Sequence, residues 1–214
     1  MTVFKCKTDP NGDPREGGVC RKFRISISEG GSADVHVDTF SSCVDDITNR
    51  IITLVGSTIN AKQTSIDVGG AYFHGTPPSM DEGGRLLFAV SPPWLEHFGP
   101  YPAAEKRGRK RLLLISGNMP GRKDAGRIWQ HRFDRFLTSY GLRQLVTDRR
   151  VWVLRTPAGI LILHDHVDDT RMTWTGDIAG SAFYIAWAVE FNSPPEPEEL
   201  SEDFTGLRHH RIDQ

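Results

Sequence analysis

Apolar residues recur at helical spacing in three segments of the chain, and each segment predicts an amphipathic helix. The first helix is expected to open at Ser42-x-x-Asp45, which has the spacing of a capping box. The second is expected over roughly residues 122–140 and the third over about 178–191, with Gly141 suited to a left-handed residue after the second. The apolar faces are Ile47, Ile51, Leu54 and Val55 in the first helix, Trp129, Phe133, Phe136, Leu137 and Tyr140 in the second, and Ile178, Ala182, Ile185 and Val189 in the third.

Shorter apolar runs predict strands before and between these helices. The first 29 residues predict a hairpin, because Val3 and Phe4 precede an Asn11-Gly12 turn signal and alternating apolar positions follow it. The last two runs flank the turn sequence Thr-Pro-Ala-Gly and are expected to pair. Helices mixed with mostly antiparallel strands predict an α+β domain. Beyond the hairpin, the expected strands are 63–69, 85–90, 111–116, 151–154 and 160–163.

Composition indicates an ordinary globular protein. The chain has 214 residues, of which 38% are hydrophobic and 25% charged, so it suits one domain or two subdomains that share a core. No apolar run approaches the roughly 18 residues that a membrane span needs, so no membrane partner is expected. The N-terminus has no apolar signal core, which predicts an intracellular protein, cytoplasmic or nuclear. Three cysteines without a C-x-x-C pair predict free, buried thiols.

Charge is unevenly distributed along the chain. The net charge is only −1, but residues 105–135 carry ten Lys and Arg against three acids, a segment of +7 in a remainder of −8. Concentrated basic residues are what contact with a phosphate backbone requires, although a solvated basic loop has the same composition. The densest part of this segment consists of Lys106, Arg107, Arg109, Lys110 and Arg111.

Three carboxylates are placed where strands end. Asp67 ends one apolar strand, and Asp168 and Asp169 follow another, ILILHDHV. Adjacent aspartates at a turn can aim one carboxylate at a site and keep the other nearby. Magnesium binds one or two carboxylates together with water and substrate phosphates. Two such ions, about 3.5–4 Å apart, would stabilise both the attacking and the leaving oxygen of a phosphoryl transfer.

The same strand offers a competing metal site. His164-x-His166-x-Asp168 nearly matches the H-x-H-x-D-H zinc cluster of metallo-β-lactamase-type hydrolases, which also follows a strand. Imidazole nitrogen is a good zinc ligand, so a zinc-dependent hydrolase is an alternative interpretation. Asp169 replaces the final histidine of that cluster, and about 45 residues remain downstream for further ligands.

Six segments, taken in order, resemble a known family. The hairpin, the first helix, the Asp67 strand, the second helix, the Asp168-Asp169 strand and a final short strand are similar to those of copia-type retrotransposon reverse transcriptases. IDVGGAYFHG resembles D-V-x-x-A-F-L-x-G, and ILILHDHVDDT resembles I-L-x-x-Y-V-D-D. The remaining segments are VFKCKTDPNGDPREGGVCRKFRI, DTFSSCVDDITNRI, PGRKDAGRIWQHRFDRFLTSYGLRQLVTDRRVWVL and FTGLRHHRI.

The resemblance implies roles for individual residues. It implies that Asp67, Asp168 and Asp169 are catalytic and hold the metal, with the Val68 carbonyl assisting. It places Lys22 and Arg24 on the incoming triphosphate and Tyr72 against the ribose 2′-hydroxyl. Asp124 stands where the family has a glutamine beside the nucleotide, so a carboxylate there is expected to repel the triphosphate. His166 stands where the family has tyrosine, and Gly126 where it has proline.

The resemblance also implies an architecture and a reaction. The expected fold is a right-hand polymerase palm of mostly antiparallel strands backed by helices, with a fingers hairpin. Residues 1–214 would form one fingers and palm domain, in which fingers elements at about 1–60 and 76–125 interleave with the palm and the thumb lies outside. The expected activity is RNA-directed DNA polymerisation with two Mg²⁺ ions, or Mn²⁺, an RNA template, a DNA or RNA primer and dNTPs. The alternative within the family is a catalytically decayed relic that binds nucleic acid weakly.

Overall fold

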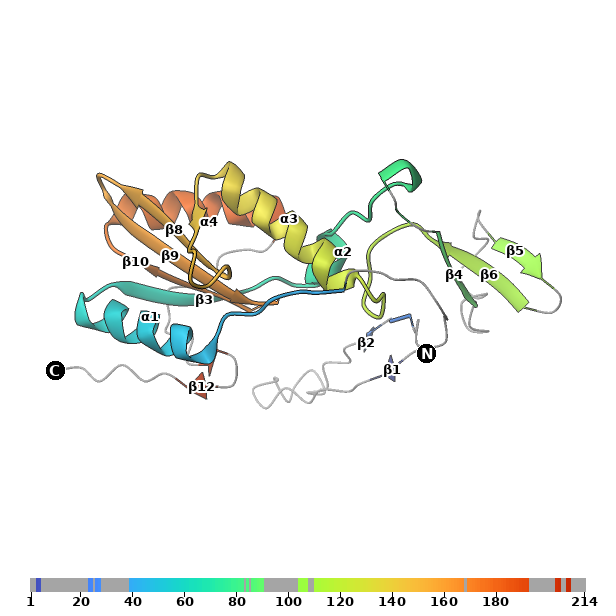
Figure 1. Ribbon diagram of the computed structural model, residues 1–214, viewed down its shortest axis with the longest axis horizontal. Coiled ribbons are helices and arrows are strands. Elements are labelled where there is room, and N and C mark those ends of the chain that lie inside the picture. Colours follow the sequence, from blue (N-terminus) through green and yellow to red (C-terminus); the bar gives the residue numbers. More distant parts are fainter. Residues whose placement is uncertain are drawn as a thin grey trace, which may run out of the picture.

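A five-stranded sheet forms the centre of the computed structural model, which describes residues 3–4, 23–24, 26–27, 39–82, 84, 86–90, 104–107, 110–167, 169–192, 203–204 and 207–208. The strands run in the order β3-β10-β9-β8-β7, and every pairing between neighbours is antiparallel. Helices cover this sheet (Figure 1), so the expectation of an α+β fold with a mostly antiparallel sheet is confirmed. The strands are β3 Lys62–Asp67, β7 Arg143–Gln144, β8 Val151–Thr156, β9 Gly159–His166 and β10 Asp169–Trp174.

The helices lie on both faces of the sheet. Helices α3 and α4 lie together on one face and α1 lies on the other (Figure 1). The short helix α2 follows β3 and packs against α3. The helices are α1 Asp46–Thr58, α2 Ala71–His74, α3 Ala125–Ser139 and α4 Asp177–Phe191, with a 3-10 turn, η2, at Met80–Glu82.

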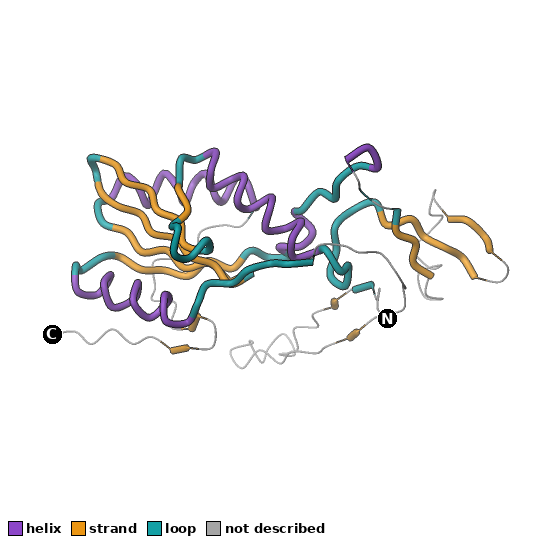
Figure 2. The backbone as a smooth tube through the Cα atoms, in the orientation of Figure 1, coloured by secondary structure: helices purple, strands orange, loops and turns teal. Residues whose placement is uncertain are grey.

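Smaller sheets account for the other strands of the described chain. A three-stranded sheet, in the order β4-β6-β5, lies at the far end of the molecule from β8 and β9 (Figure 2). The strands expected at 85–90 and 111–116 are therefore confirmed, and they pair directly. The expected N-terminal hairpin is present as an antiparallel β1–β2 pair, while its Asn11-Gly12 turn lies outside the described residues. These strands are β1 Val3–Phe4, β2 Phe23–Arg24, β4 Leu87–Val90, β5 Ala104–Arg107, β6 Lys110–Ile115, β11 Asp203–Phe204 and β12 Leu207–Arg208.

The main core lies between the sheet and α3 and α4. Alternate strand positions face these helices, because side chains alternate across a strand. Helix α3 buries the face that its sequence predicts, and Gly141 after it takes a φ of +97°, the left-handed conformation expected there. Core side chains include Leu161, Leu163, Met172 and Trp174 from the sheet, Trp129, Phe133 and Leu137 from α3, and Phe183, Trp187 and Phe191 from α4.

Helix α1 turns an unexpected side to the sheet. Asn49, Ile52 and Gly56 are its buried residues, whereas the apolar face expected at Ile47, Ile51, Leu54 and Val55 is exposed. Glycine at position 56 allows this close approach, since a Cβ there would lie 2.7 Å from Cγ2 of the β-branched Thr173 on β10 and 2.6 Å from Nε2 of Gln63 on β3. The helix also begins later than the capping box implied. Its N-cap is Asp45, whose carboxylate accepts a 2.8 Å hydrogen bond from the Ile47 amide.

Helix α4 departs from the sequence prediction in the same way. Its buried face is Phe183, Trp187 and Phe191, whereas Ile185 and Val189 on the expected face are 67% and 80% exposed. Large aromatic side chains bury more area than aliphatic ones, so the aromatic stripe determined the packing. The expected burial of the thiols is wrong for Cys43, which is free and exposed. No helix within the described residues is long and apolar enough to cross a membrane.

Candidate active site

Backbone pairing brings two of the three predicted carboxylate positions together. Asp67, the last residue of β3, is the register partner of Asp169, the first residue of β10. Asp169 also pairs with His166 across the tight β9–β10 hairpin. Register partners in an antiparallel pair lie on one face, with Cβ atoms about 4.5–5.5 Å apart. We call this end of the sheet, with Asp67, Asp169 and the hairpin turn at residues 167–168, the carboxylate end; Asp168 itself lies outside the described residues.

The donor chemistry of the carboxylate end fits a hard divalent cation. Two aspartates on neighbouring strands supply oxygen ligands, which Mg²⁺ and Mn²⁺ prefer. The Val68 carbonyl accepts a 3.1 Å hydrogen bond from the Ala71 amide, and a carbonyl oxygen has a second lone pair for another contact. No group of three His, Cys, Asp or Glu side chains positioned for a metal occurs among the described side chains, which do not include those of Asp67 and Asp168.

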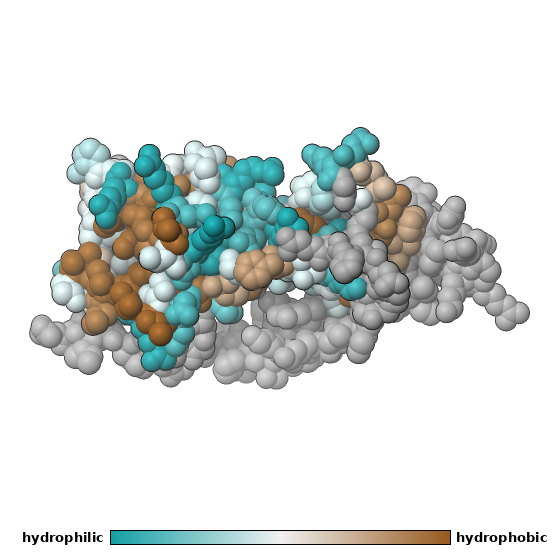
Figure 3. Space-filling model, in the orientation of Figure 1, coloured by the Kyte–Doolittle hydropathy of each residue, from teal (hydrophilic) through white to brown (hydrophobic). Residues whose placement is uncertain are grey.

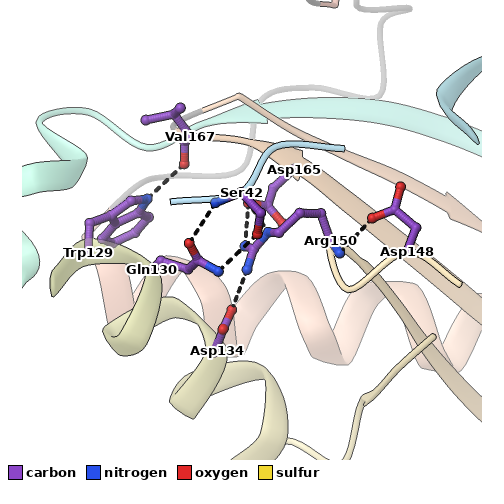
Figure 4. A network of polar contacts seen from close by, with 8 residues as sticks. All are labelled: Ser42, Trp129, Gln130, Asp134, Asp148, Arg150, Asp165 and Val167. Atoms are coloured by element: carbon purple, nitrogen blue, oxygen red, sulfur yellow. Dashed lines mark hydrogen bonds and ion pairs between the residues drawn. The ribbon is translucent and has the colours of Figure 1, made fainter. Parts of the chain in front are cut away.

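The hairpin turn has a strained backbone that α3 holds. Val167 has a φ of +65°, a left-handed conformation that is rare for a β-branched residue. Its carbonyl accepts a 2.7 Å hydrogen bond from the indole N–H of Trp129, whose ring is buried in the core (Figure 4). The sequence predicts Trp129 only as a core residue, because helical periodicity reports burial and carries no signal for a polar contact at the edge of the ring.

A buried ion network lies beneath the same hairpin. Arg150 donates from Nε and NH2 to one oxygen of Asp165 on β9, and from NH1 to Asp134 on α3 at 2.8 Å (Figure 4). Burial raises the pKa of Asp165 to about 7, and the charge of Arg150 opposes that rise. The Asp165 backbone carbonyl accepts a hydrogen bond from the Val44 amide, so the network also fixes the segment that leads into α1. No sequence pattern singled out Arg150.

Tyr72 and Asp124 both lie at the junction of α2 and α3. Tyr72 is half-buried on α2, and its carbonyl accepts a 2.7 Å hydrogen bond from Asn118, whose amide also donates to the Ala125 carbonyl of α3. Asp124 is 7% exposed and forms a two-point ion pair with Arg122 at 3.0 and 3.1 Å. Arg122 therefore neutralises the carboxylate that was expected to repel a triphosphate, and the expected repulsion is correspondingly weakened.

The basic residues are placed by their strands. Arg24 lies in β2, and Lys22 and Arg109 lie outside the described residues. In the β5–β6 hairpin, Lys106 is the register partner of Arg111, and Arg107 is the partner of Lys110. Like charges directly opposite each other destabilise a sheet. A bound anion would therefore lower the repulsion between the basic residues at these four positions. They belong to the three-stranded sheet and are not part of the carboxylate end.

The two histidines of the alternative zinc cluster differ in their surroundings. His164 is fully buried, and its Nε2 lies 2.9 Å from Oδ1 of Asn49 on α1. His166 is exposed at the end of β9. Alternation puts both histidines on the α1 face of the strand, but α1 covers His164 and leaves His166 open. The structure therefore gives His164 a packing role between β9 and α1.

The chain was also compared with known proteins. No family model matches the chain, no curated protein matches it, and no solved structure matches it. The similarity to copia-type reverse transcriptases therefore remains a resemblance carried by the sequence segments described above.

Proposed function

We propose that the chain is the fingers and palm region of a retrotransposon RNA-directed DNA polymerase. The observation that carries the proposal is the register of β3, β10 and β9, which sets Asp169 opposite both Asp67 and His166; Asp168 is the neighbour of Asp169 in the sequence. The pairing is independent of the family resemblance, because it follows from backbone hydrogen bonds between strands distant in the sequence. Polymerisation with two metal ions needs carboxylates close enough together to hold both ions.

In this proposal the five-stranded sheet with α3 and α4 is the palm. Asp67, Asp168, Asp169 and the Val68 carbonyl would hold two Mg²⁺ or Mn²⁺ ions, which supply charge stabilisation for the transferring phosphoryl group. The primer 3′-hydroxyl attacks the α-phosphate of a dNTP, its proton is lost to solvent, and pyrophosphate leaves. Lys22 and Arg24 bind the triphosphate, and Tyr72 lies against the sugar and excludes a 2′-hydroxyl. Asn118 supports that placement by holding the Tyr72 backbone to α3.

The basic β5–β6 hairpin supports a nucleic-acid partner. Its four described basic positions are cross-strand neighbours, and Arg109 lies between them in the sequence. Such a cluster suits the phosphate backbone of an RNA template paired with its primer. A variant in which Lys106, Arg107, Arg109 and Lys110 are all neutralised should bind nucleic acid with a weaker salt dependence. The slope of log affinity against log salt should become shallower by about 0.9 for each duplex phosphate that the variant no longer neutralises. An unchanged slope would leave the hairpin as a solvated surface.

Primer extension on an RNA template, with and without Mg²⁺, tests the activity. The parent chain should extend the primer only with Mg²⁺ or Mn²⁺, and Asp67→Asn or Asp168→Asn should reduce the rate at least about 10³-fold, because each removes a ligand of the reacting metals. Asp46→Asn is the matched control, since Asp46 is an exposed aspartate in the first turn of α1, paired with Arg50. Activity of Asp67→Asn within tenfold of the parent would remove Asp67 from the site.

Two other results would select the alternatives. Salt-dependent binding of the template without extension would indicate a decayed relic of the same family. Tightly held zinc in the purified protein, lost in His166→Ala, would favour the zinc hydrolase that uses His164, His166 and Asp168. Zinc binding there would require His164 to exchange Asn49 for the metal.

A further inference from the structure

Trp129 contacts one half of the carboxylate end directly and reaches the other half through His74. Its indole N–H donates to the Val167 carbonyl, in the turn next to Asp168 and Asp169. Its ring centroid lies 6.2 Å from that of His74 at the end of α2. His74 Nε2 in turn lies 3.3 Å from the Gly69 carbonyl, in the loop that follows Asp67. One buried side chain thus connects the strand end of Asp67 with the turn that bears the other two aspartates.

The turn needs an external support of this kind. A two-residue hairpin of right-handed strands requires a positive φ, which glycine and asparagine adopt readily and valine does not. Val167 nevertheless has a φ of +65°. Strained backbone persists where the surrounding structure overdetermines it. The hydrogen bond from Trp129 is the described contact that holds the Val167 carbonyl in this orientation.

Two other buried tryptophans, Trp152 and Trp187, make no comparable bond within the part of the chain that the structure describes. The indole N–H groups of Trp152 and Trp187 are buried without a hydrogen-bond partner among the described residues. Trp187 belongs to the same aromatic cluster as Trp129, through Phe133 and Phe191. This core can therefore hold a tryptophan whose indole N–H has no acceptor among the described residues. The hydrogen bond of Trp129 is thus not required for packing and is specific to the turn.

We propose that Trp129 is a positioning residue that sets the hairpin turn and so fixes Asp168 and Asp169 relative to Asp67. The proposal rests on the assignment of these aspartates as metal ligands. Trp129 touches neither substrate nor metal in it, and acts only through the Val167 carbonyl and through His74. Loss of the indole N–H should loosen the turn, and with it the geometry of the carboxylates, beyond the effect of a smaller aromatic ring in the core.

The test compares Trp129→Phe with Trp187→Phe in the full chain. Both replacements shrink a buried indole to a phenyl ring, but only the first removes a hydrogen bond to the turn. Hydrogen exchange of peptides covering residues 160–172 reports the turn directly, without any need for activity. Mn²⁺ binding, followed by electron paramagnetic resonance, reports the carboxylates. Loss of the hydrogen bond from the indole N–H to the Val167 carbonyl should speed exchange in the turn and weaken Mn²⁺ binding about fivefold to tenfold in Trp129→Phe.

Each outcome has a defined meaning. Faster exchange and weaker Mn²⁺ binding in Trp129→Phe, with Trp187→Phe near the parent in both, would support the proposal. Equal effects in the two variants would overturn it, since the consequences would then come from core packing. If the parent chain binds no Mn²⁺ but Trp129→Phe alone loosens the turn, the metal site fails and with it the proposed polymerase, while the control of the turn by Trp129 stands.

Discussion

The two faces of the five-stranded sheet are built on different chemistry. The face toward α3 and α4 is mainly apolar, with Leu161, Leu163 and Met172 all fully buried. The face toward α1 is largely polar, and yet His164, Arg171 and Thr173 on it are also buried. Cross-strand register places these three residues in adjacent rows on β9 and β10, behind Asp169 at the carboxylate end.

The chemistry of each face decides which side of its helix is used. The apolar face receives the apolar stripe of α3, in which Phe133 and Leu137 are 1% and 0% exposed. The polar face receives the narrow side of α1, where Asn49 binds His164 and Gly56 allows close approach. The strong apolar stripe of α1 is left facing outward, within the brown area over α1 in Figure 3. A helix therefore matches the surface offered to it, even against its own periodicity.

The largest expected effect is the loss of unfolding free energy when a buried leucine on the apolar side is truncated to alanine. Leu137 on α3 is fully buried, so Leu137→Ala removes apolar packing and leaves a cavity. Such substitutions cost about 2–5 kcal/mol of unfolding free energy. Urea denaturation followed by tryptophan fluorescence measures the cost, and an unchanged slope with denaturant would show that the unfolded state is unaffected. A loss below about 1 kcal/mol would mean that the α3 face is not the main core.

The second prediction concerns Arg150, which forms a buried ion pair with Asp165 on the mainly apolar face. Arg150→Met leaves the buried carboxylate of Asp165 and that of Asp134 without their partner, which should cost about 3 kcal/mol. The Asp165→Asn background is the control, because the loss should shrink when no buried charge is stranded.

The same variant should change how stability depends on pH. Burial raises the folded-state pKa of Asp165 to about 7, and removing Arg150 removes the charge that opposes this rise. A carboxyl with a raised folded-state pKa binds a proton more tightly when folded, so its contribution is full below the unfolded pKa and is lost as pH rises to the folded value. The contribution of Asp165 to the unfolding free energy stops declining near pH 7 in the parent, whereas in Arg150→Met it goes on declining to a higher pH. The loss of unfolding free energy caused by Arg150→Met should therefore be larger at pH 8.5 than at pH 6. An equal loss at the two pH values would contradict this prediction.

The third prediction weakens the polar face. Asn49 is 1% exposed and its Oδ1 accepts the 2.9 Å hydrogen bond from Nε2 of His164. Asn49→Ala leaves that imidazole nitrogen buried opposite a methyl group, which should cost about 1–3 kcal/mol. Arg50→Ala, one residue along on the exposed side, should cost less than about 0.5 kcal/mol, because its ion pair with Asp46 is a surface i,i+4 pair. Equal costs would mean that α1 is held only by Ile52 and its apolar neighbours.

Much of the backbone could be predicted from the sequence. Strands β3, β4, β6, β8 and β9 lie where short apolar runs predict them, and α3 lies where its periodicity predicts it. These elements are local, because the turn residues and the apolar spacing that define them are contiguous. The pairing of Asp67 with Asp169 also requires β10, a strand that no apolar run predicted.

What the sequence did not predict depends on interactions between distant residues. The inverted use of α1 and α4 follows from the sheet faces and the aromatic core, which no single segment contains. The bond from Trp129 to Val167 joins residues 38 positions apart, and the Arg150–Asp165 pair joins residues 15 apart. Asp124 was expected to repel a triphosphate, but its buried carboxylate forms a two-point ion pair with Arg122, and no sequence pattern predicted that shared burial.

The last and smallest effect is expected on the outward stripe of α1. Leu54→Ala repeats the substitution of Leu137 on a side chain that is 68% exposed. Little apolar packing is removed, alanine favours a helix slightly more than leucine, and surface substitutions usually stay within about 0.5 kcal/mol of zero. The unfolding free energy should therefore match that of the parent at protein concentrations tenfold apart. A loss above about 1 kcal/mol that grows with concentration would show that α1 is covered in an assembly. The same loss at every concentration would show that Leu54 is covered within the chain, and the contrast between the two faces would then lie in chemistry and not in burial.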